Sequence, residues 1–238
     1  MVKYEVQERK KVIEIPYEVI TVKHRGNDLN FATSAFGPGD FYSLREKIDS
    51  SKLGLVMPTL EETVSLVHSA IENKDKRHAK DILKILDKNW FYANNAITYV
   101  PHEGMYVEDN PKVKDGKVIL NKEIARFAPF GYKIGSMSPL ELEKNQGVIA
   151  LVGEEGAEKL AQIAHKYISN PRFWSFDSTD KEIVMVPALG GDWHGGRLGV
   201  DADGHGGVDG GYAFGVLSSC EASTPKNKGY GRHKNNRI

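Results

Sequence analysis

The sequence predicts an α+β protein built as a single domain. Segments with the alternation of strands lie near both ends of the 238-residue chain, and segments with helical periodicity lie between them. No stretch is rich enough in Pro, Gly or Ser to mark a boundary between domains, and no internal repeat is visible. Helices flanked by strands that can pair with one another are typical of the α+β class.

The first elements come from alternation and capping patterns. Residues 11–22 alternate apolar and polar side chains, which predicts a half-buried strand. Gly37-Pro38-Gly39 predicts a turn before a helix over residues 41–50. Thr59 and Glu62 have the spacing of a capping box and predict the start of a second helix. The apolar stripe of that helix is Leu60, Val64, Val67 and Ile71.

Later elements follow from residue type and spacing. Residues 79–86 repeat the helical pattern, and a further helix is expected from Glu154 to Tyr167. Aromatic and β-branched residues predict short strands elsewhere. These strands are expected at residues 90–92, 97–100, 104–107, 172–176, 182–186 and 212–217.

Charge and composition exclude several classes of function. Lys and Arg together balance Asp and Glu at 32 each, so a nucleic-acid or membrane surface is not expected. The N-terminus has no apolar export signal, and no run reaches the roughly 18 apolar residues of a membrane span. The single cysteine, Cys220, excludes an internal disulfide and a thiolate metal cage. Residues 221–238 form a basic tail that we expect to be disordered.

The segment from Gly190 to Gly215 needs its own explanation, because it holds 11 of the 24 glycines. A flexible surface linker is one interpretation, since glycine raises backbone entropy. Trp193, Leu198 and Phe214 oppose it, because large apolar side chains are typical of an anchored segment.

A calcium loop is a second interpretation. Asp201, Asp203 and Asp209 fit positions one, three and nine of such a loop, with Gly206 at position six. His205 stands where an oxygen ligand is usual, and Tyr212 replaces the acidic ligand at position twelve. The loop Asp201-Asp203-His205-Asp209 therefore remains an alternative as a weak ion site in a lectin-like domain.

A transition-metal or catalytic site is a third interpretation. His194 and His205 could join an aspartate as ligands, but their spacing matches no metal motif. No serine nucleophile elbow is present, and Gly153-Glu154-Glu155-Gly156 lacks the Lys-Ser/Thr ending of a phosphate loop. We therefore expect no enzyme activity, no metal and no cofactor.

A fourth interpretation rests on the residue types that this segment lacks. Between His194 and Tyr212 there is no Lys, Glu, Gln, Met or Trp. The residues present can all arise from asparagine codons by replacement of the first two adenines, whereas the missing types need a purine in the third position. The composition of the segment indicates adenine-directed mutation.

Several motifs are similar to the variable proteins of diversity-generating retroelements. The pattern Gly190-Gly191-x-Trp193-x-Gly195, with a closing Ala213-Phe214-Gly215-Val216, resembles their variable region. Residues 56–63, 89–91, 127–135 and 174–177 resemble the archaeal branch of these proteins. Many members have an arginine after Phe-Gly, where this chain has Val216-Leu217, so the end of the variable region is less sharply defined.

This resemblance implies a C-type lectin-like fold over residues 1–220, with paired terminal strands, two to three helices and a variable region at about 190–215 on one face. It implies a ligand-binding protein diversified by a retroelement. The residues expected to be displayed are Gly191, Asp192, His194, Gly196, Gly199, Asp201, Asp203, His205, Gly207, Asp209, Gly211 and Tyr212. The expected scaffold residues are Trp193, Arg197, Leu198, Val200, Ala213 and Phe214.

The displayed set suggests the chemistry of a ligand, which we expect to be a protein surface. Tyr212 is the expected affinity anchor, because tyrosine offers contact area at low entropic cost. The aspartates favour a basic patch, and His194 and His205 would make binding sensitive to pH. An enzyme of the formylglycine-generating type shares this fold, but it needs more cysteines than Cys220 alone. Oligomeric state and location, on a virion or in the cytoplasm, stay open.

Overall fold

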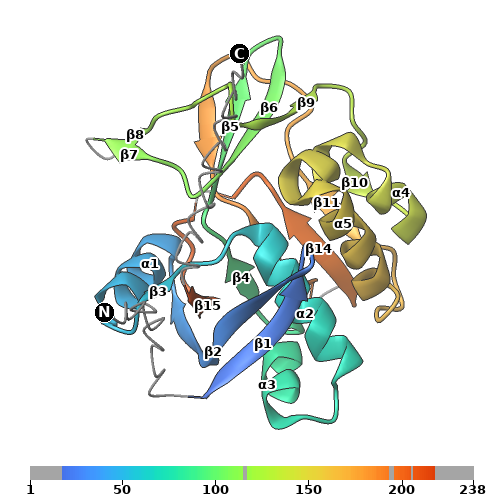
Figure 1. Cartoon of the computed structure of the whole chain (residues 1–238). Coiled ribbons are helices and arrows are strands. Elements are labelled where there is room, and N and C mark those ends of the chain that lie inside the picture. The colour runs from blue at the N-terminus through green and yellow to red at the C-terminus, as the bar shows by residue number, and fades with distance from the viewer. Residues whose placement is uncertain (1–17, 115–116, 193–195, 205, 218–238) are drawn as a thin grey trace, which may run out of the picture.

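The computed structural model describes residues 18–114, 117–192, 196–204 and 206–217, and the expected disordered tail lies outside these ranges. Most strands belong to one nine-stranded sheet, whose order is β1-β2-β15-β4-β13-β14-β11-β10 with β3 paired to β15. Figure 1 shows α1 on one flank of the molecule, α4 and α5 on the opposite flank, and the four-stranded sheet β12-β5-β6-β9 at the top.

The elements have the following bounds. The helices are α1 (Phe41–Ser50), α2 (Leu60–Glu72), α3 (Arg77–Leu86), α4 (Pro139–Glu143) and α5 (Gln146–Ala164). The strands of the large sheet are β1 (Val19–His24), β2 (Asn27–Gly39), β3 (Leu55–Val56), β4 (Trp90–Tyr92), β10 (Gly135–Ser136), β11 (Arg172–Trp174), β13 (Ala188–Asp192), β14 (Arg197–Asp201) and β15 (Gly211–Leu217). The others are β5 (Asn95–Val100), β6 (Gly104–Asp109), β7 (Val113–Lys114), β8 (Lys117–Val118), β9 (Arg126–Pro129) and β12 (Ile183–Met185).

The first and last described strands meet through β2. Antiparallel β2 pairs with β1 through Ala32 and Val19, and with β15 through Phe31 and Val216. The terminal strands therefore lie in one sheet, but β1 and β15 each pair with β2 and not with each other, so the predicted direct pairing is not observed among the described strands. The N-terminal strand was expected at residues 11–22, and its described part, β1, runs from Val19 to His24.

The capping patterns locate the helices well. Thr59 accepts a hydrogen bond from the Glu62 amide at 3.3 Å, and the Glu62 carboxylate accepts one from the Thr59 amide at 2.7 Å, which completes the capping box of α2. The predicted α1 has the observed bounds, with Asp40 as its N-cap. Helices α2 and α5 pack together in the main core, where Leu60, Val64 and Leu160 are fully buried.

Two expectations about elements were wrong. The residues Gly37-Pro38-Gly39 lie within β2 and not in a turn, because Gly211 and Ala213 of β15 hold that end of β2 extended. The described residues contain five helices, more than the two to three expected. Helix α5 spans Gln146–Ala164, but Gly153 is non-helical, with φ of 71°, so a helical segment begins at Glu154 as the sequence predicted; it ends at Ala164 rather than at Tyr167.

Candidate functional site

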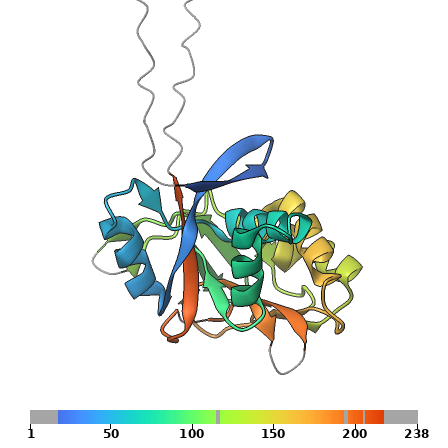
Figure 2. The same cartoon turned by 90° about the horizontal axis from the view of Figure 1, so that it is seen from below.

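The predicted variable region forms a hairpin and a loop that leads into β15. Antiparallel β13 and β14 pair Ala188 with Asp201 and Gly190 with Gly199, next to β4 on one side and β11 on the other. Figure 2 shows this hairpin at the edge of the molecule that lies opposite the β1–β2 ribbon. The segment therefore has an ordered backbone through its described strands.

Alternate residues of the segment point into the core. Leu198, Val200 and Ala202 are fully buried, and they lie in the main hydrophobic cluster. Ala213 and Phe214 are also buried, and the Phe214 ring lies 5.8 Å from the ring of Phe91. Arg197 is half-buried and Trp193 lies outside the described residues. Burial of this kind is what a scaffold role requires, and the role itself stays a prediction.

The loop between β14 and β15 is held to five other parts of the chain. The Ala202 amide donates to the Trp174 carbonyl at 2.8 Å, and the Tyr99 hydroxyl donates to the Ala202 carbonyl at 2.9 Å. Beyond it, the Gly204 carbonyl accepts from the Val186 amide at 2.9 Å.

Two further bonds hold the second half of the loop. The Gly206 carbonyl accepts from the Phe41 amide at 2.8 Å, and the Val208 carbonyl accepts from the Tyr92 hydroxyl at 3.0 Å. All five of these bonds use backbone atoms of the loop, so none depends on a loop side chain. Such anchoring contradicts the flexible-linker interpretation for the described residues of this loop.

The predicted displayed residues divide into three groups. One group has exposed or half-exposed positions, a second group is buried, and the side chains of a third group lie outside what the structure describes. The exposed or half-exposed residues are Gly196, Asp201, Asp203, Gly207, Asp209 and Tyr212. The buried ones are Gly191, Gly199 and Gly211. His194 and His205 lie outside the described residues, and of Asp192 only the backbone in β13 is described.

The three buried glycines are not displayed, and their surroundings explain why each is glycine. A Cβ at Gly211 would lie 2.3 Å from Cε2 of Tyr92, and one at Gly199 would lie 2.5 Å from Cζ3 of Trp174. At Gly191 it would lie 2.8 Å from the Leu86 carbonyl oxygen. These distances leave no room for a side chain unless the neighbour moves, so we remove the three residues from the displayed set.

By contrast, Gly207 has open space around it. A Cβ added there meets nothing within 4 Å, and its backbone does not need a positive φ. Gly196 and Gly210 also have open space, but their φ angles of 55° and 104° favour glycine. Among these three open glycines, Gly207 is the one at which a side chain is compatible with both space and backbone.

Asp201 and Asp203 form a close acidic pair at the end of β14. The Asp201 carboxylate accepts a hydrogen bond from the Asp203 amide at 2.9 Å. Burial, together with the side-chain hydrogen bond and the charge of Asp203, raises the pKa of Asp201 to about 7. A carboxyl group held in this way keeps its proton more readily than an ordinary aspartate.

The calcium alternative finds no support in this geometry. Among the described residues, no three His, Cys, Asp or Glu side chains converge on a point that could hold a metal ion. Asp201, Asp203 and Asp209 therefore do not form an oxygen cage by themselves. His205, the remaining member of that alternative, lies outside the described residues.

Sequence reasoning missed two tryptophans that flank the hairpin on its outer face. Gly199 pairs with Gly190 on one side and with Arg172 on the other, and Gly190 in turn pairs with Trp90. The rings of Trp90 and Trp174 meet edge to face at 5.8 Å above Gly199, and the Arg172 guanidinium lies 5.2 Å from the Trp174 ring.

Both tryptophans are half-exposed, so they add aromatic area to the candidate surface. The period-two alternation of β11 could have indicated that Arg172 and Trp174 share a face. The cross-strand neighbours of Gly199, in contrast, cannot be read from the sequence.

Comparison with known proteins identifies the fold. The chain is similar to a solved structure described as "Accommodation of massive sequence variation in Nanoarchaeota by the C-type lectin fold", with a TM-score of 0.50 and 13% sequence identity over 77% of this chain and 96% of that one. The chain has a C-type lectin fold, as the sequence predicted. The sequence matches no family profile and no curated protein.

Among the described residues, no helix is both long enough and apolar enough to cross a bilayer.

Proposed function

We propose that this protein binds a ligand through the face formed by residues 190–215, and that adenine-directed mutagenesis by a retroelement writes the sequence of that face. The supporting observation is the backbone anchoring of the loop between β14 and β15. Five hydrogen bonds from other elements reach its backbone atoms, so the loop can keep its course while its side chains change.

The composition of the segment supports the mutagenesis part of the proposal. The exposed positions carry Gly, Asp and Tyr, all of which asparagine codons yield when their first two adenines change. The inward positions Leu198, Val200 and Phe214 supply the burial that holds the strands. A structural neighbour from Nanoarchaeota, whose description names massive sequence variation accommodated by the C-type lectin fold, supports the proposal that this fold carries a variable face here.

The displayed set that we propose is smaller than the sequence indicated. It contains Gly196, Asp201, Asp203, Gly207, Asp209 and Tyr212, and it extends to Asp192, His194 and His205 on the basis of the sequence. Trp90 and Trp174, which lie outside residues 190–215, contribute aromatic area beside it. Large aromatic side chains dominate the energetics of interfaces, so a fixed pair can support binding by many versions of a neighbouring small, polar surface.

The chemistry of this surface suits binding rather than catalysis. Asp203 and Asp209, joined by Asp201 when it is ionised, give the described part of the face a negative character, which favours a basic, hydrogen-bond-donating patch on a protein partner. Asp201 and Asp203 form a close pair of carboxylates in the described part of this face, and no third potential metal ligand converges on them among the described residues. We propose a binding protein without enzymatic activity.

Sequencing the DNA that surrounds the gene tests the retroelement directly. We expect a second, near-identical copy of the codons for residues 190–215, which differs from the gene only where the copy has adenine, beside a reverse-transcriptase gene. The codons for α2 are the matched control and should have no second copy. A complete surrounding sequence that contains no such copy would contradict the retroelement and leave the binding proposal to be tested by ligand screening.

A further inference from the structure

The first turn of α1 lies beside the loop between β14 and β15. The Phe41 amide donates to the Gly206 carbonyl of this loop at 2.8 Å, and β2 pairs with β15 as far as Gly39, two residues before α1 begins. Figure 2 shows α1 beside β15. Residues 40–42 therefore border the face formed by residues 190–215, although they lie far upstream of it in the sequence.

A large aromatic side chain is exposed at this border. Tyr42 is 64% exposed, and its ring meets the buried ring of Phe41 edge to face at 5.3 Å. Val208, two residues beyond Gly206 in the loop, is 68% exposed. The hydrogen bond between Phe41 and Gly206 thus joins two segments that each present an apolar side chain to solvent. Tyrosine is enriched at protein interfaces, since its ring offers contact area at low entropic cost.

The charge around Tyr42 is negative. Glu46 follows Tyr42 by four residues, so these two exposed side chains are neighbours on one face of α1. The Ser43 amide, which donates to the Asp40 carboxylate at 3.0 Å, holds the pKa of Asp40 below its ordinary value, so this group is ionised at neutral pH. Asp209 is exposed on the adjoining loop. Within the described part of the chain, Asp40, Glu46 and Asp209 form no ion pair.

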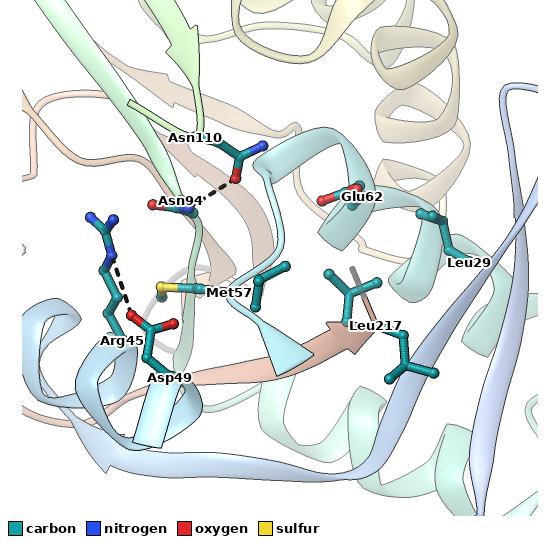
Figure 3. A pocket seen from close by; sticks show the side chains of 10 residues that line it. Leu29, Arg45, Asp49, Met57, Glu62, Asn94, Asn110 and Leu217 are labelled. Atoms are coloured by element: carbon teal, nitrogen blue, oxygen red, sulfur yellow. Dashed lines mark hydrogen bonds and ion pairs between the residues drawn. The ribbon is translucent and has the colours of Figure 1, made fainter. Parts of the chain in front are cut away.

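The two cations of α1 do not neutralise this charge. Arg45 forms an ion pair with Asp49 at 4.0 Å, and both side chains line a separate cavity (Figure 3). Lys47 lies on another side of α1, because five residues advance an α-helix by about 140° around its axis from Tyr42. An exposed aromatic ring and the neighbouring carboxylate of Glu46 are therefore both available to a cation from another molecule.

We propose that the binding face extends onto α1, where Tyr42 and Glu46 form an upstream contact for an arginine of the protein ligand. The guanidinium stacks on the Tyr42 ring and pairs with Glu46, and the basic segment that carries it continues over Val208 and Asp209. Arginine fits better than lysine, because its planar, weakly hydrated guanidinium stacks on aromatic rings. This inference rests on the proposed function, since the ligand reaches α1 from residues 190–215.

Three peptides of the same length test the upstream contact on the full-length protein. We would titrate the acetylated, amidated peptide (Gly-Arg)₃-Gly into ¹⁵N-labelled protein, and compare it with the peptides that carry citrulline or lysine in place of arginine. We expect the arginine peptide to shift the backbone amide resonances of Tyr42 and Glu46 in a saturable manner, with a Kd of about 1 mM or tighter at low salt. The uncharged citrulline peptide should bind about tenfold more weakly, and the lysine peptide about threefold more weakly. Equal binding of the arginine and lysine peptides, or no saturable shift with the arginine peptide, would overturn the proposal.

Variants of Tyr42 isolate the role of the aromatic ring. Tyr42→Ala removes the ring and should weaken the arginine peptide about threefold or more, whereas Tyr42→Phe keeps the ring and should change Kd less than about twofold. Ile124→Ala is the matched control: it shortens a side chain that is 71% exposed and precedes β9, and it should leave Kd unchanged. Thermal unfolding checks that each variant is folded. An Ile124→Ala effect as large as that of Tyr42→Ala would overturn the upstream contact.

Charge variants separate this inference from the proposed function. Glu46→Gln and Asp209→Asn should each weaken the arginine peptide about twofold or more, whereas Asp28→Asn, which removes an exposed carboxylate paired with Lys23, should leave Kd unchanged. An effect of Glu46→Gln without one of Asp209→Asn would support the upstream contact and contradict the role of the loop in binding. An effect of Asp209→Asn without one of Glu46→Gln or Tyr42→Ala would support the loop and overturn the upstream contact.

Discussion

The loop from Ala202 to Gly210 is held by hydrogen bonds to its backbone, whereas the helical layer of α2 and α5 is held by the packing of its side chains. In the helical layer, side chains such as Leu60, Val64 and Leu160 are fully buried, so the identity of each side chain supports the packing. In the loop, hydrogen bonds reach backbone carbonyls and an amide. The comparison teaches that a region can be ordered without committing its own side chains, and this property suits a surface whose sequence changes.

The largest loss of stability is expected from a substitution in the helical layer. Leu60→Ala removes a fully buried side chain from α2 and leaves a cavity in the main core. We expect the free energy of unfolding to fall by about 2–5 kcal/mol in urea denaturation. A loss below about 1 kcal/mol would show that side chains matter no more in α2 than in the loop.

The next effect concerns the buried glycines of the hairpin and β15. Gly211→Ala places a Cβ against the ring of Tyr92, which is itself buried, and we expect a loss of about 1–3 kcal/mol. Gly207→Ala is the matched control, since nothing lies within 4 Å of the added atom. Equal stability of the two variants in thermal and urea unfolding would contradict the removal of Gly211 from the displayed set.

Two tyrosines test the backbone anchors themselves. Tyr99→Phe removes the hydroxyl that binds the Ala202 carbonyl and Ser175 in a fully buried site, so we expect a loss of about 1–3 kcal/mol. Tyr92→Phe removes the bond to the Val208 carbonyl and should cost less, about 0.5–1.5 kcal/mol. Amide hydrogen exchange of the loop should accelerate in both variants. Unchanged exchange would argue that the loop is held by something other than these hydroxyls.

The acidic pair predicts a dependence on pH. The pKa of Asp201 in the folded protein is raised to about 7, above its ordinary value of 3.8. Between pH 4 and 7 the folded state therefore binds more protons here than the unfolded state, so this group makes stability fall as pH rises through that window. Above about pH 7 its contribution is constant. The difference in unfolding free energy between the wild type and Asp201→Asn should follow this course, and a difference that is independent of pH would contradict the raised pKa.

The smallest effects are expected at the exposed positions of the loop. Asp209→Asn and Gly207→Asn change side chains that the backbone anchors do not use, so each should alter the free energy of unfolding by less than about 0.5 kcal/mol. Urea denaturation of both variants measures this. Losses comparable to that of Gly211→Ala would show that the loop depends on its side chains after all.

Local signals predicted the elements that depend on local interactions. The capping box of Thr59 and Glu62 marked the start of α2, and residue type and alternation marked β15 and part of β1, although not the strand β2 that lies between them. The sequence did not predict strand β2, because its second half, which includes Gly37 and Gly39, is held extended by its pairing with β15. Pairing with a strand far away in the sequence can hold the backbone extended at residues whose types are typical of turns.

The candidate surface was predicted in outline, and its details depended on contacts across strands. The inward alternation of Leu198 and Val200 was visible in the sequence. The burial of Gly199 was not visible, because it comes from Trp90 and Trp174 on two other strands. The sequence does not distinguish an exposed glycine from a buried one. The difference depends on which residues of the neighbouring strands lie opposite the glycine, and that is set by the strand register.

The backbone anchors of the loop have a consequence for how such a protein could evolve. The groups that hold the loop from outside belong to Phe41, Tyr92, Tyr99, Trp174 and Val186, and all of them are encoded upstream of residue 190. Under the proposed function, changes of exposed side chains within residues 190–215 leave these five anchoring groups untouched. The buried side chains of the same segment, Leu198, Val200 and Phe214, still have to fill the core, so only its outward positions are free to vary.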